Sequence, residues 1–598
     1  MAALEDRLNS VTAKFGIWQF GVFLLVALVK IPSAWHMLGV LFKAPDAEFW
    51  CEQPKTLAHL PTDVWINISH PIKEEKNGKK YYNPCEIYDI GFEGLVEDDK
   101  YHKYSVVDYV KNISYSASLR PCQEFRYDNN SVFHETVVTE WHLVCNRRIL
   151  VNVSQFFYLF GVLTGGFFAT MLLPRVGPRS ILMFGAIVQI ITGTATAFVP
   201  LLEMNITLRF TAACGCALMF TAGYVICRDI TWGQARILTC AFYEWFWSFG
   251  VMSLPGLTLL FGTTSWRVLQ VAISVPTAAI LVIAFFFLPE SPRWLMENGQ
   301  FEEAEEILRK IAEVNRQPLP PEESFHNHKS HVSHVRRDSK KRGKTSKWLI
   351  WFGLFKGQGF CKMIALHLLW ATTIVTYYGA LLNVKNLGSN LFLNIVIAGL
   401  AEIVGVILGA LLILFAGKHK WHYLGIILLT GGISCIFSWT LFLDTVEGKL
   451  QPIGFNWWHQ WALLALAMIG RIAVACSLTL LQVSSAEIVS TTSPDHQKMT
   501  SLSSVTFARI CLLSAPFIGY LAIYGKQISL TAFGSLTMLG GFCSLVLAVP
   551  KEMSLCFPGN SQLDKTWTFK GRQSIWTINQ ESRMAERTES FNQSFTVE

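Results

Sequence analysis

The chain has 598 residues, of which 51% are hydrophobic and only 16% are charged, and its formal net charge is +7. A soluble protein of this length carries about 25% charged residues, so the composition argues against a soluble fold. The sequence contains no P-loop, H-E-x-x-H, G-x-S-x-G or G-x-G-x-x-G pattern, which are marks of ATP-driven pumps and common enzymes. We therefore expect neither an enzyme nor a cofactor or metal.

Long apolar runs recur along the chain. A bilayer core about 30 Å thick requires about 20 apolar residues per helix. The runs predict an all-α membrane protein with twelve spans, at 17–42, 150–172, 179–199, 207–228, 238–262, 266–288, 360–384, 389–416, 421–443, 460–483, 503–524 and 527–549. Residues 17–288 and 360–549 are then two six-helix bundles, related by a pseudo-twofold axis along the membrane normal.

Residues 43–149, between spans 1 and 2, are polar and contain Cys51, Cys85, Cys122 and Cys145. The segment also carries three N-glycosylation patterns, at Asn67, Asn112 and Asn129. In an oxidising, extracellular compartment four cysteines predict two disulfides, with three connectivities open.

Residues 289–359, between the two bundles, carry the basic run from Arg336 to Lys344. The positive-inside rule places this run in the cytoplasm, which explains it better than nucleic-acid binding does. The two ends of the chain, 1–16 and 550–598, are then cytoplasmic as well. Within 289–359, residues 301–315 show the apolar stripe of an amphipathic surface helix. Ser339 resembles a basophilic kinase site, which adds a kinase to the potential partners.

Three short motifs give the sequence a family resemblance. They are Pro289-Glu-Ser-Pro-Arg-Trp-Leu295 after span 6, Trp370 followed by Tyr377-Tyr378-Gly379 in span 7, and Gly470-Arg471 in span 10 leading to Ala486-Glu487. Together with the cysteine-containing loop after span 1, they resemble the organic cation, carnitine and organic anion transporters of the major facilitator superfamily. The resemblance covers about residues 15–550 and includes insect members of the family.

The resemblance implies a major facilitator fold with a disulfide-bonded extracellular loop domain, in which Cys51 pairs with Cys122 and Cys85 with Cys145. It implies a secondary transporter in the plasma membrane that moves small organic cations or zwitterions of the carnitine, betaine, β-alanine or amine-conjugate type by alternating access. The expected partners are this small organic ion and the lipid bilayer. An organic anion transporter of the urate or carboxylate type, and a non-transporting sensor on the same scaffold, are the alternatives.

The gating motifs depart from the pattern of the family. Pro174 replaces the acidic residue expected between spans 2 and 3, and Leu414 replaces the one between spans 8 and 9. The arginine expected after Glu487 is absent, so the cytoplasmic gate is expected to be weaker or wired differently. By resemblance, the predicted gating residues are Asp229, Arg236, Glu290, Arg293 and Glu487.

Charged side chains within the spans mark the expected transport path. A charge at the bilayer centre costs about 3 kcal/mol, so spans carry charge mainly for function. The interiors of spans 3, 6, 9 and 12 carry none, and in the resembling family these four helices face lipid. The charges predicted to line the central cavity are Lys30, Glu244, Glu402, Arg471 and Arg509.

Glu244 and Arg509 lie on spans 5 and 11, which are equivalent in the two bundles. Each lies about six residues, or about 9 Å, from the predicted cytoplasmic start of its helix. In the resembling family an arginine at the span 11 position accompanies anionic or carnitine-like substrates, so Arg509 is predicted to bind a carboxylate and Glu244 an amine. Alternatively, the two pair with each other or with neighbours. Lys30 either receives a carboxylate or neutralises Glu244, and Glu402 and Arg471 either contact substrate or form a structural ion pair.

Aromatic side chains complete the predicted substrate site. An ammonium ion over an aromatic face gains about 0.5–2 kcal/mol. Trp370 and Tyr377 lie seven residues apart, on one face of span 7, and Tyr243 adjoins Glu244. We predict that these three rings line the cavity, with core or lipid packing as the alternative.

Overall fold

The computed structural model describes most of the chain. The described residues are 8–9, 11–12, 14–54, 60–74, 80–89, 118–128, 132–318, 359–387, 390–438, 444–446, 449–451, 457–488 and 494–549. Within them, twelve helical spans are long and apolar enough to cross a membrane, which confirms the predicted number. The predictions for Asn112, Asn129, Ser339 and the tail 550–598 lie outside the described residues.

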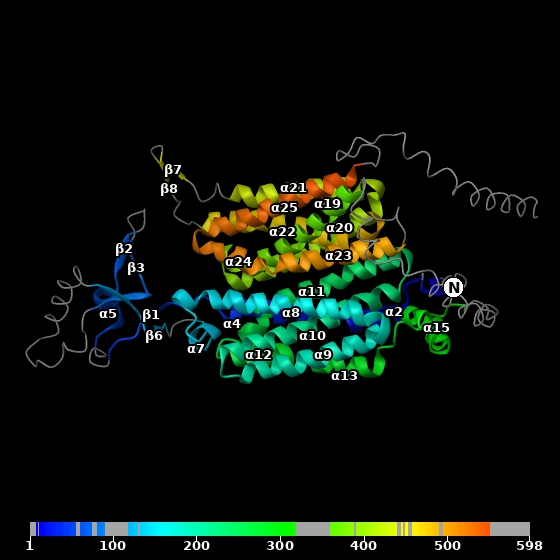
Figure 1. The fold of residues 1–598 in the computed structure, drawn as a ribbon, viewed down its shortest axis with the longest axis horizontal. Coiled ribbons are helices and arrows are strands. Elements are labelled where there is room, and N and C mark those ends of the chain that lie inside the picture. Colours follow the sequence, from blue (N-terminus) through cyan, green and yellow to red (C-terminus); the bar gives the residue numbers. More distant parts are fainter. Residues whose placement is uncertain are drawn as a thin grey trace, which may run out of the picture.

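The first six spans form one bundle, drawn in blue to green in the lower half of Figure 1. Their elements are α2 (Ile17–Leu28), α3 (Lys30–Leu38) and α4 (Val40–Lys43), α8 (Ile149–Val176), α9 (Pro178–Ala195) with η4 (Thr196–Phe198), α10 (Leu202–Asp229), α11 (Gly233–Phe261), and α12 (Trp266–Ser274) with α13 (Pro276–Phe287). Helix α10 packs against both α8 and α9, and α11 packs against α3.

The last six spans form the second bundle, drawn in green to red above the first one (Figure 1). Their elements are α19 (Gly359–Leu382) with η5 (Val384–Leu387), α20 (Leu391–Phe415), η6 (Gly417–His419) with α21 (Lys420–Phe437), α22 (Trp457–Ile488), α23 (Pro494–Leu512), α24 (Ala515–Tyr520) with η8 (Leu521–Ile523), and α25 (Lys526–Ala548). Helix α19 packs against α23 and α25, and α21 packs against α22 and α25.

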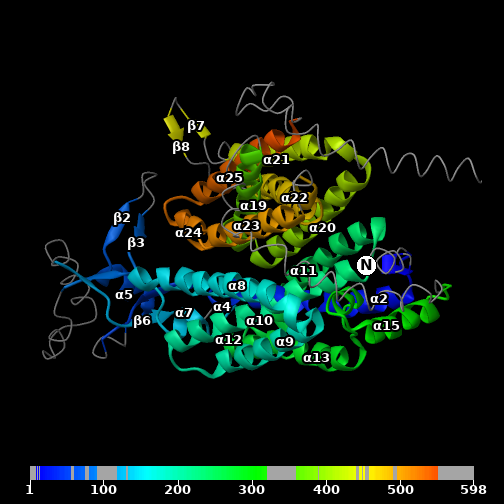
Figure 2. The same ribbon diagram turned by 45° about the vertical axis from the view of Figure 1, so that its right-hand side comes forward.

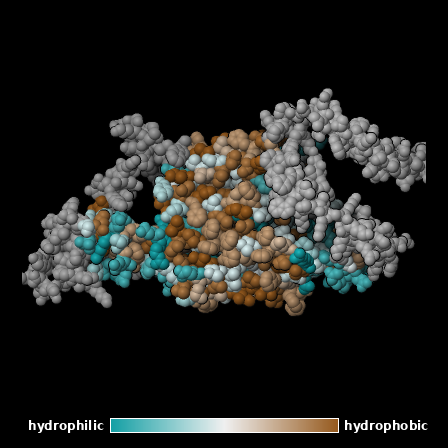
Figure 3. All heavy atoms as spheres, in the orientation of Figure 1, coloured by the Kyte–Doolittle hydropathy of each residue, from teal (hydrophilic) through white to brown (hydrophobic). Residues whose placement is uncertain are grey.

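The two bundles meet along α11 with α20, and along α8 with α23 and α24. Figures 1 and 2 place α9 and α13 at one edge of the molecule and α21 and α25 near the opposite edge. This agrees with the outer position expected for spans 3, 6, 9 and 12. Figure 3 shows an apolar surface over the helical region, with hydrophilic residues gathered toward its ends.

Prolines interrupt spans 1 and 11 beside two of the predicted site residues. Pro32 has no N–H for the carbonyl four residues before it, and span 1 is interrupted at Val29, directly before Lys30. Pro516 follows the break between α23 and α24 in the same way, and Arg509 lies in the last turn of α23. Interrupted helices are a common place for binding sites in secondary transporters.

The helix starts before Glu244 and Arg509 differ from the predicted ones. Helix α11 begins at Gly233 and not at 238, and α23 begins at Pro494 and not at 503. Both helices continue into polar sequence at their N-terminal ends, where hydropathy gives no signal. Glu244 therefore lies deeper along its helix than the predicted six residues, whereas the apolar part of α23 begins at Leu502, close to the predicted start of span 11.

The loop domain between spans 1 and 2 consists of short antiparallel strand pairs and helices. These elements are β1 (Phe49–Cys51) with β6 (Phe125–Tyr127), β2 (Ile72–Glu74) with β3 (Lys80–Tyr82), β4 (Glu86–Tyr88) with β5 (Leu119–Pro121), α5 (Thr62–Ser69), α7 (Val137–Glu140) and η3 (Cys145–Arg147). The structure pairs Cys51 with Cys122 and Cys85 with Cys145, as the resemblance implied. Asn67 is exposed on α5, and its glycosylation stays a prediction. A further strand pair, β7 (Asp444–Val446) with β8 (Lys449–Gln451), lies between spans 9 and 10.

Two helices follow span 6, α14 (Pro292–Glu297) and α15 (Phe301–Val314). The second of them, α15, lies beside α2 at the end of the helical region opposite to the loop domain (Figure 1). The apolar stripe of α15 is buried at Ala304, Leu308 and Ile311, which confirms the predicted amphipathic helix. Asn315 ties α15 to span 1, because its Nδ2 donates to Gln19 Oε1 at 2.6 Å.

Candidate functional site

Lys30 and Glu244 form a buried ion pair inside the first bundle. Lys30 Nζ lies 2.7 Å from Glu244 Oε1 and 2.8 Å from Oε2, and the two residues are 6% and 5% exposed. The ammonium also lies 4.5 Å from the ring centre of Tyr243 and 5.8 Å from that of Phe220. Of the two predicted roles for Lys30, the structure shows the neutralisation of Glu244.

Glu402 and Arg471 form the corresponding pair in the second bundle. Arg471 Nη2 lies 2.5 Å from Glu402 Oε2, and the hydroxyl of Tyr377 donates to Oε1. Arg471 also donates from Nε to Ala398 O at 3.1 Å and from Nη1 to Tyr377 O at 3.0 Å, with its guanidinium 5.0 Å from the Tyr377 ring centre. Each of these polar groups has a partner, so the structure favours the structural ion pair.

Arg509 differs from the other four charged residues. In the part of the chain that the structure describes, no carboxylate lies within salt-bridge distance of its guanidinium and no hydrogen bond to it is found. The half-buried side chain reaches from α23 to α8, because a Cβ added to Gly166 would lie 1.7 Å from Arg509 Nη1. The predicted alternative, in which Arg509 pairs with Glu244, is therefore not observed. A guanidinium with free N–H groups is suited to bind a carboxylate through two parallel hydrogen bonds.

Tyr378 of α19 lies among these charges. Its hydroxyl is within electrostatic range of Glu244, Glu402, Arg471 and Arg509. Its ring centre lies 5.7 Å from that of Trp247 and 4.8 Å from that of Tyr377, both in edge-on geometry. Neither Tyr378 nor Trp247 was among the predicted binding residues. The tyrosine pair in span 7 could have indicated Tyr378, and the aromatic residues around Glu244 could have indicated Trp247.

The three predicted aromatic residues occupy different surroundings. Tyr243 is fully buried, holds the Lys30 ammonium over its ring and donates from its hydroxyl to Phe220 O at 3.2 Å. A cavity of about 30 Å³, with room for about one water molecule, lies beside Tyr377 and Arg471. Trp370 does not line this cavity and packs in the core, which corresponds to the core-packing alternative.

A second group of buried basic residues lies toward the end of the first bundle that carries the loop domain. Lys43 Nζ donates to Gln270 Oε1 at 2.5 Å, and Arg209 Nη2 donates to Gln155 Oε1 at 2.9 Å. His36 lies within electrostatic range of both cations. Both cations thus donate to neutral oxygen atoms. The sequence analysis missed Lys43 and Arg209, because the predicted spans ended at 42 and began at 207 and both residues therefore resembled interfacial charges.

Comparison with known proteins decides the family. The protein-family model described as "Sugar (and other) transporter" matches residues 87–493, which is more than half of the chain. The chain belongs to this transporter family. It is a membrane transporter and not an enzyme, as expected.

Similar proteins cover nearly the whole transporter. The organic cation transporter-like protein of Drosophila melanogaster is 26% identical over 89% of this chain and 88% of its own length. The organic cation/carnitine transporter 2 of Mus musculus is 25% identical over 97% and 96%, and the beta-alanine transporter of Drosophila melanogaster is 25% identical over 92% and 87%. The solved structure of the major facilitator superfamily proton:xylose symporter XylE, bound to 6-bromo-6-deoxy-D-glucose, matches with a TM-score of 0.52 at 15% identity, over 89% of this chain and 94% of that one. The predicted fold and the resemblance to organic cation and carnitine transporters are confirmed.

Asp229 and Arg236, two of the predicted gating residues of the transporter, have different partners in the first bundle. Ser291 Oγ donates to Asp229 Oδ2 at 2.9 Å, and Arg228 Nη2 lies 3.2 Å from Asp229 Oδ1. Among the described residues Arg236 forms no salt bridge to Asp229, and its guanidinium lies 4.5 Å from the ring centre of Trp232. Asp229 and Arg236 are seven positions apart in the sequence, but Asp229 bonds to Arg228 and Ser291 and not to Arg236.

Glu290 supplies a carboxylate beside the loop between spans 2 and 3, where Pro174 replaces the acidic residue of the family. Its Oε1 accepts from the backbone N–H of Arg179 at 2.9 Å, so a carboxylate faces the N-terminus of α9 where the family's loop acid is missing. Burial raises the pKa of Glu290 above its usual value in spite of this bond. Arg293 Nη2 donates to Asn9 Oδ1 at 3.2 Å, within the same half of the protein. Glu487 lies in α22, and its side chain is outside the described part of the structure.

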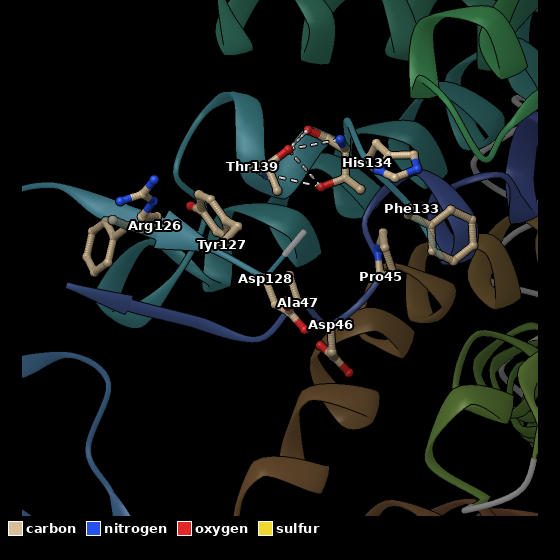
Figure 4. A pocket seen from close by; sticks show the side chains of 11 residues that line it. Pro45, Asp46, Ala47, Arg126, Tyr127, Asp128, Phe133, His134 and Thr139 are labelled. Atoms are coloured by element: carbon tan, nitrogen blue, oxygen red, sulfur yellow. Dashed lines mark hydrogen bonds between the residues drawn. The ribbon is translucent and has the colours of Figure 1, made fainter. Parts of the chain in front are cut away.

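At the end of the helical region where the loop domain lies, Asp46 connects the two bundles. Arg148 Nη2, before α8, lies 2.8 Å from Asp46 Oδ1, and Lys385 Nζ, in η5 of the second bundle, lies 3.4 Å from it. Phe42 and Phe392 meet beneath this bridge with ring centres 5.2 Å apart. Asp46 also lines a pocket of about 300 Å³ where the loop domain joins span 1 (Figure 4). The predicted gating residues were all cytoplasmic and did not include this contact.

Proposed function

We propose that this transporter moves small organic zwitterions of the carnitine, betaine, β-alanine or amine-conjugate type across the plasma membrane by alternating access. The observation that carries the proposal is Arg509, a guanidinium at the junction of the bundles without a carboxylate partner among the described residues. Relatives named as carnitine and beta-alanine transporters support a substrate that carries both a carboxylate and an amine.

The substrate groups have distinct partners in this proposal. A carboxylate on Arg509 forms charge-assisted hydrogen bonds, worth about 1.5–3 kcal/mol. The ammonium group lies against the rings of Tyr378 and Trp247, where an aromatic face contributes about 0.5–2 kcal/mol. Tyr378 is also within electrostatic range of both buried acids, Glu244 and Glu402, which favours a cation beside its ring.

An organic anion is the second candidate substrate. The five predicted cavity charges comprise three cations and two carboxylates, and both carboxylates are paired, with Lys30 and with Arg471. The remaining positive charge belongs to Arg509. A monoanion would neutralise it, whereas a zwitterion would leave the cavity with a net positive charge.

Uptake into cells that express the transporter tests the proposal. Radiolabelled β-alanine, carnitine, tetraethylammonium and urate are compared in the wild type, in Arg509→Gln and in the surface control Arg309→Gln. We expect saturable uptake of the zwitterions, which Arg509→Gln lowers about 10- to 150-fold and Arg309→Gln leaves unchanged. Preferred uptake of urate would favour the anion, and the absence of saturable uptake of any compound would favour a sensor.

A further inference from the structure

Lys30 occupies a place that has the chemistry of an ammonium-binding site. Both oxygens of Glu244 accept hydrogen bonds from its Nζ, and the rings of Tyr243 and Phe220 lie within cation–π distance. A carboxylate with aromatic faces is the arrangement that recognises organic ammonium ions. We propose that Lys30 is a tethered ammonium that fills this subsite and keeps free organic cations out of it. The inference rests on the proposed function for its transport path and adds the residue that selects among substrates.

The two buried ion pairs differ in how exchangeable their cations are. Arg471 bonds to Glu402 and also to two backbone carbonyl groups. Among the described residues, the hydrogen bonds of Lys30 Nζ go to Glu244 alone, and an ammonium has three equivalent donors. An external ammonium can therefore replace Lys30 bond for bond, whereas a replacement for Arg471 would have to satisfy the backbone as well.

The walls of this subsite are held in place by the backbone. A side chain on Gly250 would bring its Cβ to 2.8 Å from Ile31 O, so α11 lies directly against the start of α3. A Cβ on Gly223 would lie 2.5 Å from the hydroxyl of Tyr243, which donates to a backbone carbonyl of α10. The carboxylate and the aromatic ring are thus preorganised, and a ligand that replaces Lys30 would not have to order them.

The Lys30–Glu244 ion pair affects which substrates the transport path accepts. With Lys30 in place, neither of the two acids in the predicted cavity set is left unpaired. A cation without a carboxylate would lose its hydration and gain no ion pair, whereas a substrate with a carboxylate gains Arg509. Lys30 therefore favours carboxylate-bearing substrates over plain organic cations.

Lys30→Ala leaves a space with the shape of n-propylammonium, which makes this ion the appropriate probe. Uptake of radiolabelled n-propylammonium is measured in the wild type, Lys30→Ala, the double variant Lys30→Ala/Glu244→Gln, and Lys43→Ala. The last is a matched control, since it removes a buried lysine of the same span whose acceptor is the neutral Gln270. We expect uptake about tenfold above the wild type in Lys30→Ala and wild-type levels in the other two variants.

Equal uptake of n-propylammonium by the wild type and Lys30→Ala would overturn the proposal, and so would a gain that persists without Glu244. If Lys30→Ala folds only when an organic ammonium ion replaces the missing side chain, purification in n-propylammonium chloride must restore the folded protein and purification in sodium propionate must not. Restoration without a gain in uptake would identify a purely structural ion pair. The two proposals can fail separately. If the wild type fails to take up β-alanine while Lys30→Ala gains n-propylammonium uptake, the proposed substrate is refuted and the role of Lys30 in the subsite is supported.

Discussion

Gly166→Ala is expected to displace the Arg509 guanidinium without removing it. The added Cβ would lie 1.7 Å from Nη1. Ordinary contact needs about 3.5 Å, so the guanidinium must move by about 2 Å. A charge-assisted hydrogen bond of about 1.5–3 kcal/mol is lost if the substrate carboxylate no longer meets its donors, which raises the KM for zwitterion uptake about 10- to 150-fold. The end of an arginine side chain can move aside, so the melting temperature of the purified transporter should hardly change.

The neighbouring Gly165 provides the matched control. A Cβ there would lie 2.5 Å from Cys214 O and 2.7 Å from Cys214 Cα, which are backbone atoms of the packed helix α10. Gly165→Ala should therefore lower the melting temperature in detergent, whereas Gly166→Ala raises KM at nearly constant melting temperature. An unchanged KM in Gly166→Ala, or an equal loss of thermal stability in both variants, would refute the reasoning.

Three further predictions concern the ion pairs and the loop domain. Arg471→Met leaves Glu402 buried without its cation and should cost about 3–5 kcal/mol of stability, while adding Glu402→Gln should recover most of the loss; melting of both variants checks this, and additive losses would contradict it. Burial lowers the pKa of His70 from 6.5 to about 4, so the unfolded loop domain binds more protons between these values. The contribution of His70 to stability should be fully present above pH 6.5 and decline toward pH 4, which hydrogen exchange of β1 can follow, and an unchanged exchange rate over this range would count against it. Burial tends to raise the pKa of Asp46, but neighbouring cations, Lys385 foremost, bring it below its ordinary value of 3.8. The salt bridges of Asp46 with Arg148 and Lys385 are then lost only as the pH falls below 3.8. The ratio of uptake by Asp46→Asn to uptake by the wild type should therefore stay constant from pH 5 to 8, and a ratio that changes in this window would contradict the prediction.

Much of the fold could be predicted, because the bilayer restricts what a span can be. A backbone without water must satisfy its own hydrogen bonds, so each long apolar run had to be a helix. The stripe of α15 was predictable for the related reason that a surface helix buries one face. The disulfide partners followed from the resemblance alone, since Cys51 and Cys122 are 71 positions apart and spacing left three connectivities open.

The pairing of the buried charges could not be predicted. Lys30 and Glu244 are 214 positions apart, and their meeting depends on the rotation of two helices and on the interruption of span 1 before Pro32. Hydropathy also could not predict the start of helix α23, since residues 494–501 are helical but polar and only the apolar part of the helix, from Leu502, gives a signal. Which cation has no acidic partner among the described residues was therefore decided by tertiary packing.

A cryo-electron microscopy structure of the transporter with β-alanine or carnitine bound tests the central claim most directly. The account predicts that the substrate carboxylate lies within about 3 Å of the Arg509 guanidinium, with the amine toward Tyr378. A substrate bound elsewhere, with Arg509 paired to a carboxylate of the protein itself, would contradict it.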